Sequence, residues 1–213
     1  TNNGKDMSGL LKLVKILPLT KIESLALSNN VMCGVDENGD GTYSSEAIIE
    51  LFEVLKGSSV TSLGVAANFL GPDGGAALAE GLKGNSTLQS LDLGNNTLCG
   101  INESGKGTYT TEGIAKLCEA VQGSAVTSLD LYHNHLCGLD DSLDDPDHGT
   151  YTTKGIAMLC EALKGSAMTS LKVDAHALQI DELNGTKPTE RIDLSGKGLS
   201  VASAIIIASC IKE

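Results

Sequence analysis

The chain has 213 residues, a formal net charge of −12 and a single arginine, Arg191. This charge disfavours nucleic-acid binding through phosphate neutralisation and attachment to an anionic membrane, and it favours a basic protein partner, although acidity also serves solubility alone. Aromatic residues make up only 3% of the chain and tryptophan is absent, so the core of an ordinary globular enzyme is not expected. No segment has the length of a transmembrane helix.

A short phrase recurs along the chain and sets its organisation. The clearest copies read Leu-x-Leu-x-x-Asn, which predicts a short strand with one buried face. The asparagine is placed to hydrogen-bond backbone groups where the chain leaves the strand, and an inward apolar residue and an amphipathic helix are expected after it. The copies begin at Leu25, Leu63, Leu91, Leu129, Leu171 and Ile192, the last two being weaker.

In chain order, the first expected element is a helix with no strand phrase before it, which gives a partial repeat over residues 1–22. Its core positions are Leu10, Leu13, Val14 and Leu17. Repeats follow with starts near residues 23, 61, 89 and 127. A degenerate repeat with a loop is expected over 169–189, because no full helix fits before Ile192, and a terminal repeat over 190–213 completes a single domain, 1–213.

Between Leu63 and Leu91, 28 residues hold one expected strand and one expected helix. This unit resembles the ribonuclease-inhibitor type of leucine-rich repeat. The resemblance implies an α/β fold, a right-handed solenoid with parallel strands on its concave face and helices on its convex face.

Three repeats carry an insert between strand and helix that ends in Gly-Thr-Tyr. In the first insert, Asp36, Asn38 and Asp40 follow the spacing of a calcium-binding EF-hand loop. The twelfth position, where that loop needs glutamate, is Ala47, and the third repeat has Lys106 in the matching stretch. We therefore weigh weak calcium binding against a structural role, and predict no metal and no cofactor.

If the inserts have a structural role, they form the entry to each helix. Ser44, Thr110 and Thr152 would cap the helix starts, and Tyr43, Tyr109 and Tyr151 would pack as a column. Inserts on one rim of a solenoid also mark a binding surface. The candidate partner-binding residues on this rim are Asp140, Asp141, Asp144, Asp145 and Asp147.

The positions between the strand leucines face the concave surface, and one aromatic-rich spot lies among them. The candidate partner-binding residues there are Asp92, Asp130, Tyr132, His133, Lys172 and Asp174. They form either a binding hot spot or an exposed tyrosine on a polar sheet. An acid–base pair of His133 and Asp130 is possible in principle, but no nucleophile motif or phosphate-cradling glycine loop accompanies it.

The six cysteines recur at shared repeat positions, which predicts buried, reduced thiols. They are Cys33, Cys99 and Cys137 after the strand turn, and Cys118, Cys160 and Cys210 on helices. A bridge between Cys99 and Cys137 is conceivable, whereas zinc is disfavoured because no Cys-x-x-Cys pair occurs. This usage favours an intracellular, reducing compartment, the cytoplasm above all.

The last expected helix contains three consecutive isoleucines, which cover more than one helix face. Either the extra face packs on the preceding loop, or Ile205 and Ile206 form a docking surface. The expected function is a non-catalytic protein–protein interaction module, a scaffold or a subunit of a larger assembly. A GTPase activator, similar to the Ran type in repeat and acidity, and a calcium-responsive binder are the alternatives.

Overall fold

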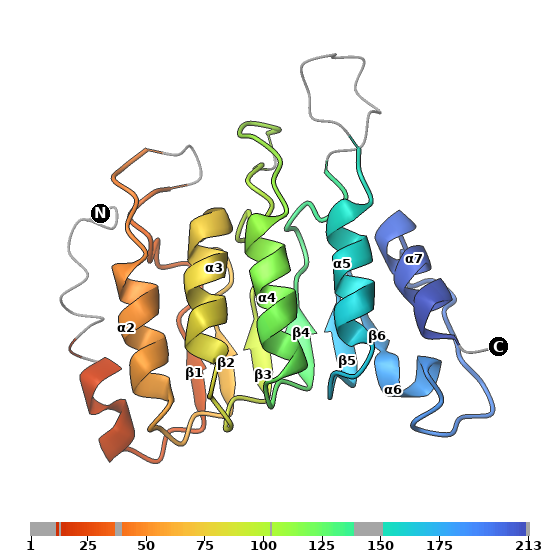
Figure 1. Ribbon diagram of the computed structural model, residues 1–213, viewed down its shortest axis with the longest axis horizontal. Helices are drawn as coiled ribbons and strands as arrows, with labels where there is room; N and C mark the ends of the chain where they lie inside the picture. Colours follow the sequence, from red (N-terminus) through yellow and green to blue (C-terminus); the bar gives the residue numbers. More distant parts are fainter. Residues whose placement is uncertain (1–11, 13, 37–39, 103, 139–150, 212–213) are drawn as a thin grey trace.

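The computed structural model describes residues 12, 14–36, 40–102, 104–138 and 151–211 (Figure 1). The helices lie side by side in one layer and a sheet lies behind them. The strands are β1 (Ser24–Ala26), β2 (Ser62–Gly64), β3 (Ser90–Asp92), β4 (Ser128–Asp130), β5 (Ser170–Lys172) and β6 (Ala177–Gln179). The helices are η1 (Leu17–Leu19), α2 (Glu46–Leu55), α3 (Gly71–Leu82), α4 (Glu112–Gln122), α5 (Lys154–Leu163), α6 (Ile180–Leu183) and α7 (Val201–Cys210).

The strand leucines form a continuous spine through the molecule. Strands β1 to β5 are parallel, and Leu63, Leu91 and Leu129 occupy the same register position on neighbouring strands. All three are buried in one core with the inward residues of the helices. The α/β solenoid with parallel strands on one face and helices on the other is therefore confirmed from β1 to β5.

The three residues predicted to cap the helix starts do hydrogen-bond them, but from one position before the N-cap. The hydroxyls of Ser44, Thr110 and Thr152 each accept a hydrogen bond from the backbone N–H two residues later. Each of these residues stands one position before the N-cap residue, whose own side chain makes no capping bond. At the N-terminal end, Val14 and Leu17 are buried, as the helical pattern predicts.

The C-terminal end departs from the predicted parallel arrangement. Strand β6 runs antiparallel to β5, with Leu178 opposite Leu171, and α6 has only four residues. Strand β6 occupies the edge of β5 on which a further parallel strand was predicted, and Ile192–Leu194 lie outside any strand. Leu199 is the residue after this phrase at the position where the repeat predicts an inward apolar side chain, and it is 36% exposed.

All six cysteines are free thiols, five of them buried and Cys137 half-buried. Burial raises the pKa of Cys33 to about 11, and it raises the pKa of Cys99 and of Cys118 to about 12. These thiols are therefore protonated at neutral pH and act as small apolar side chains. Within the described ranges, no helix is long and apolar enough to cross a membrane.

Candidate functional site

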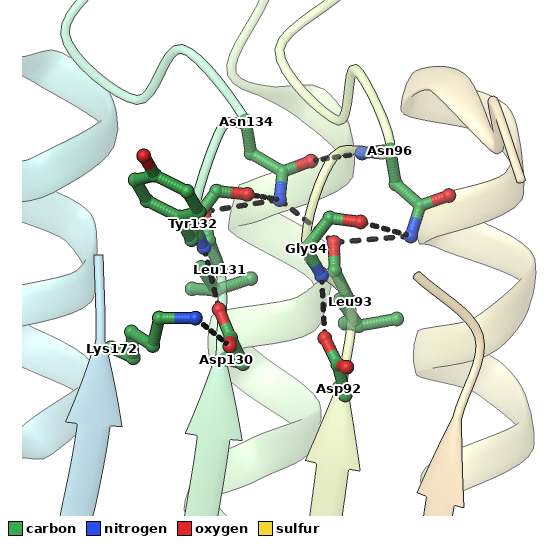
Figure 2. A network of polar contacts seen from close by, with 9 residues as sticks. All are labelled: Asp92, Leu93, Gly94, Asn96, Asp130, Leu131, Tyr132, Asn134 and Lys172. Atoms are coloured by element: carbon green, nitrogen blue, oxygen red, sulfur yellow. Dashed lines mark hydrogen bonds and ion pairs between the residues drawn. The ribbon is translucent and has the colours of Figure 1, made fainter. Parts of the chain in front are cut away.

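A ladder of buried asparagines fixes the chain where it leaves each strand (Figure 2). Asn96 donates to the carbonyl oxygens of Val65 and Leu93, both at 3.0 Å, and accepts from the backbone N–H of Asn68 at 3.0 Å. Asn134 repeats the pattern one turn later, accepting from the N–H of Asn96 at 3.2 Å. The recurring asparagine thus joins consecutive repeats, and it gives the side chains that follow it a defined direction.

The same turns hold pairs of non-glycine residues in the left-handed region of backbone space. One pair follows each of strands β1 to β4, with φ between 52° and 62°. Such a conformation is costly for β-branched and bulky residues, so these residue types do not predict it. The pairs are Asn29 and Val31, Ala67 and Phe69, Asn95 and Thr97, and His133 and His135.

The sheet face turned away from the helices, which we call the concave face, changes character along the solenoid. In the first two repeats its side chains are small, as at Ala26 and Gly64. From β3 onward it carries Asp92, Asp130 and Lys172, at the same register position on three neighbouring strands. Figure 2 shows the three side chains projecting to the same side of the sheet.

Asp130 and Lys172 form the centre of what we call the concave cluster, which also includes Asp92, Tyr132 and His133. The Lys172 Nζ lies 2.7 Å from the Asp130 Oδ2 and 5.0 Å from the centre of the Tyr132 ring. The Tyr132 and His133 rings are 4.0 Å apart between centroids. The structure therefore brings five of the six predicted concave residues together around one ion pair and one cation–π contact.

Gly94 opens a notch between the two acidic side chains. A Cβ atom at this position would lie 3.3 Å from the Asp92 Oδ1 and 3.7 Å from the Asp130 Oδ1. Each of these oxygens accepts a backbone N–H two residues later, from Gly94 and from Tyr132. The two carboxylates are thus held in fixed positions beside one another, with Lys172 bonded to one of them.

The sixth predicted concave residue, Asp174, has a structural role. It accepts hydrogen bonds from the backbone N–H of Ser200 at 2.9 Å, from the Ser200 hydroxyl at 2.7 Å, and from the Ser203 hydroxyl. Asp174 therefore holds the start of α7 against the end of the sheet. Sequence reasoning missed this because the serines lie more than twenty-five residues further along the chain.

In the structure, the two members of the possible acid–base pair, His133 and Asp130, contact different groups. The Asp130 oxygens are bonded to Lys172 and to the N–H of Tyr132, while His133 packs against the ring of Tyr132. A cleft of about 550 Å³ continues from this point to the start of α7, lined by Tyr132, His133, Asp174 and Val201.

The first and third inserts form matching turns on the rim. Val35 pairs with Gly41 and Ile101 pairs with Gly107 in antiparallel bridges. Asp36 accepts the Asp40 N–H at 3.1 Å, and Asn102 accepts the Lys106 N–H at 2.9 Å. Because a neutral amide makes the same turn, the Asp36 carboxylate has a structural function that requires no calcium.

Other predicted rim residues have different outcomes. The Tyr43 and Tyr109 hydroxyls donate to the carbonyls of Leu70 and Leu136, at 2.8 and 2.9 Å, in the next repeat. Each of these two tyrosines therefore ties one repeat to the next. The acidic rim candidates Asp140, Asp141, Asp144, Asp145 and Asp147, and Asn38 of the possible calcium loop, lie outside the described residues.

The predicted docking surface on the last helix needs correction. Within α7, Ile206 is completely buried and Ile205 is partly buried against the core. Ile206 is therefore a packing residue and is not accessible to a partner.

Comparison with solved structures finds chains with a similar fold. The actin-binding site 2 domain of leiomodin-1 superimposes with a TM-score of 0.53 and 18% identity, over 78% of this chain and 78% of that chain. The tropomodulin C-terminal domain of Caenorhabditis elegans gives 0.51 and 13%, over 79% and 82%. The leucine-rich repeat-containing protein LegL7 of Legionella pneumophila gives 0.45 and 21%, over 83% and 44%. The first two similarities, at 18% and 13% identity, show the fold alone. No family profile and no curated protein matches the sequence.

Proposed function

We propose that this chain is a non-catalytic protein-interaction module, a scaffold or subunit, that binds its partner on the concave face. Its repeats are of the ribonuclease-inhibitor type, since one strand and one helix fill 28 residues between Leu63 and Leu91. A solenoid offers a large surface that is already ordered, and little conformational entropy is lost when a partner binds it.

The observation that carries this proposal is the concave cluster. Small side chains leave the first half of the face open. The second half carries two carboxylates on neighbouring strands, and a lysine that contacts both one of these carboxylates and a tyrosine ring. Tyrosine and charged groups grouped on a rigid surface are typical of the residues that dominate binding energy. Because the cluster holds two carboxylates and one lysine, and because the chain has a net charge of −12, the proposed partner segment is basic.

Actin is the first candidate partner to test, because the leiomodin-1 domain that shares this fold is named an actin-binding site. Further partners are recovered by affinity capture with mass spectrometry. Their affinities are then measured by calorimetry with the purified wild-type chain.

The decisive variant combines Tyr132→Ala with Asp130→Asn. Loss of a hot-spot pair should weaken binding by about tenfold or more. The matched control is Glu119→Gln, which removes one negative charge from the exposed side of α4 and should leave affinity unchanged. Retained affinity in the double variant would contradict binding on the concave face, and loss only when residues 139–148 are replaced by a Gly-Ser linker would move the site to the rim.

The thiols support a reducing, intracellular compartment as the place of action, the cytoplasm above all. Five of the six cysteines are buried free thiols and none is bonded to another. Disulfides are rare in cytosolic proteins, where thiols are kept reduced.

A further inference from the structure

The asparagine ladder joins each repeat to the one before it by a shared acceptor. One side-chain oxygen accepts two backbone N–H groups of the preceding repeat. The Asn134 Oδ1 accepts from the N–H of Asn96 at 3.2 Å and from the N–H of Leu98 at 3.1 Å (Figure 2). Asn68 and Asn96 provide the same pair of bonds to the first and second repeats. A complete turn of the ladder thus needs an amide from the repeat that follows.

The fifth repeat does not supply the next amide. Its alignment holds as far as Leu131, whose N–H donates to the Lys172 carbonyl at 2.7 Å. Residues 173–176 then bend into β6. His176 stands at the sequence position of the ladder asparagine, but it is exposed, and its Nδ1 lies 2.9 Å from the carbonyl oxygen of Lys197. The ladder therefore stops at the fourth repeat.

This break leaves three backbone groups of the fourth repeat short of partners. Within the described part of the chain, the N–H groups of Asn134 and Leu136 have no hydrogen-bond acceptor, although the two residues are only 1% and 5% exposed. The Leu131 carbonyl accepts one bond among the described residues, from the Asn134 amide. The matched carbonyls of Val65 and Leu93 accept two each. Buried backbone donors without an acceptor are rare, so this place is suited to a group from outside the chain.

A cleft of about 550 Å³ lies at the break. The three residues with the unmet groups, Leu131, Asn134 and Leu136, all line it. Val201, at the start of α7, lines another side, and Asp174 holds this start in place through its bond to the N–H of Ser200. The cleft is therefore a preformed space, with its polar groups fixed by the ladder.

We propose that this cleft binds a side-chain carboxamide, from an asparagine or glutamine of the partner protein. Its oxygen accepts from the N–H groups of Asn134 and Leu136, and its nitrogen donates to the free lone pair of the Leu131 carbonyl. Complete turns of the ladder use the same arrangement, as where the Asn134 Nδ2 donates to the Leu93 carbonyl at 2.8 Å. The inference rests on the proposed function and adds a second chemical group to the basic partner segment.

The surroundings favour a carboxamide over a carboxylate. A carboxylate has no donor for the Leu131 carbonyl, and it would meet the Asp174 side chain in the same cleft of a chain with net charge −12. The cleft is also continuous with the concave cluster, because Tyr132 and His133 line it. One partner segment that lies across Tyr132 can therefore place a basic group on the cluster and a carboxamide in the cleft.

Three short peptides test this inference by NMR titration of the ¹⁵N-labelled chain. They are acetyl-Lys-Asn-Lys-methylamide and its analogues with alanine or aspartate in the middle, so the backbone carbonyls are the same in all three. The asparagine peptide should bind at least fivefold more tightly than the other two, because it forms at least two more hydrogen bonds. It should move the amide resonances of Asn134 and Leu136, while those of Asn96 and Leu98, which are already bonded, remain in place.

Val201→Trp fills the mouth of the cleft, and it should reduce the preference for asparagine over alanine to less than twofold. The control is Ile49→Trp on the exposed side of α2, where Ile49 is 49% exposed, and it should keep the preference. Far-UV circular dichroism establishes that both variants are folded. In the wild-type chain, equal binding of the asparagine and alanine peptides, unmoved resonances of Asn134 and Leu136, or tighter binding of the aspartate peptide would overturn the inference. None of these results would affect binding on the concave face, which the Tyr132 and Asp130 double variant tests with the whole partner.

Discussion

Replacing Asn96 with alanine removes the central member of the asparagine ladder. Asn96 is completely buried. Its side chain accepts the Asn68 N–H and donates to the carbonyls of Val65 and Leu93, each at 3.0 Å. These groups lie in the interior, away from bulk solvent.

The cost follows from what each group keeps. The two carbonyls retain a donor each, from the amide of Asn68 and from the amide of Asn134, so each loses only a net ~0.5–1.5 kcal/mol. The N–H of Asn68 is left buried without its acceptor, which costs about 1–3 kcal/mol. The free energy of unfolding should fall by about 2–4 kcal/mol, a large part of the ~5–15 kcal/mol of a typical domain.

Asn30→Ala is the matched control in the first repeat. Asn30 is exposed, and its amide donates to the carbonyls of Leu27 and Ser28, where water can take its place. Its loss should cost about 1 kcal/mol or less. Urea unfolding followed by far-UV circular dichroism measures both variants. If Asn96→Ala costs no more than Asn30→Ala, the ladder does not stabilise the repeats in the way described.

Three further outcomes are expected. Asp174→Asn removes a charged acceptor at the start of α7, so amide hydrogen exchange in that helix should accelerate about 10- to 100-fold. Exchange in α4 should be unaffected. Equal protection of α7 in the variant and the wild type would contradict the role given to Asp174. Burial raises the pKa of Cys99 from 9.0 to about 12, so the thiol loses its proton at a lower pH in the unfolded chain than in the folded chain. The free energy of unfolding should therefore fall as pH rises from 9 to 12. For the same reason, Cys99 should resist alkylation at pH 9 unless urea is present. Thr97 has a left-handed backbone, with φ 54°, whereas Thr127 does not. Thr97→Gly should therefore lower the free energy of unfolding by about 1 kcal/mol less than Thr127→Gly does. Equal losses in urea unfolding would show that the turn is unstrained.

The repeat phrase was sufficient to predict the register of the sheet. Leu63, Leu91 and Leu129 lie side by side because each stands at the same place in a unit that buries one face of a short strand. The asparagine at the strand exit was equally readable, since a side-chain amide there meets carbonyls of two repeats. Periodic residues report local structure that is repeated, and this is why the prediction succeeded there.

The same reasoning failed where the repeat decays. The phrase at Ile192–Leu194 matched the pattern of a strand, but the edge that it would need is already taken by β6. The role of Asp174 was also missed, because it depends on Ser200 and Ser203 in a later segment. Contacts between segments without a common period leave no trace in local spacing.

The repeats themselves supply the reference state against which a functional position can be recognised. The leucine spine and the asparagine ladder are alike in successive turns, so they account for stability and leave the surface positions free to differ. Asp130 therefore stands out because the matched residue two strands earlier is Gly64. A departure from the repeat on the outside of the solenoid marks a position to test, and its contacts decide its role: Asp174 holds the start of α7, whereas Asp130 lies in the concave cluster. A departure within the strand phrase, as at Ile192, coincides with the end of the repeat.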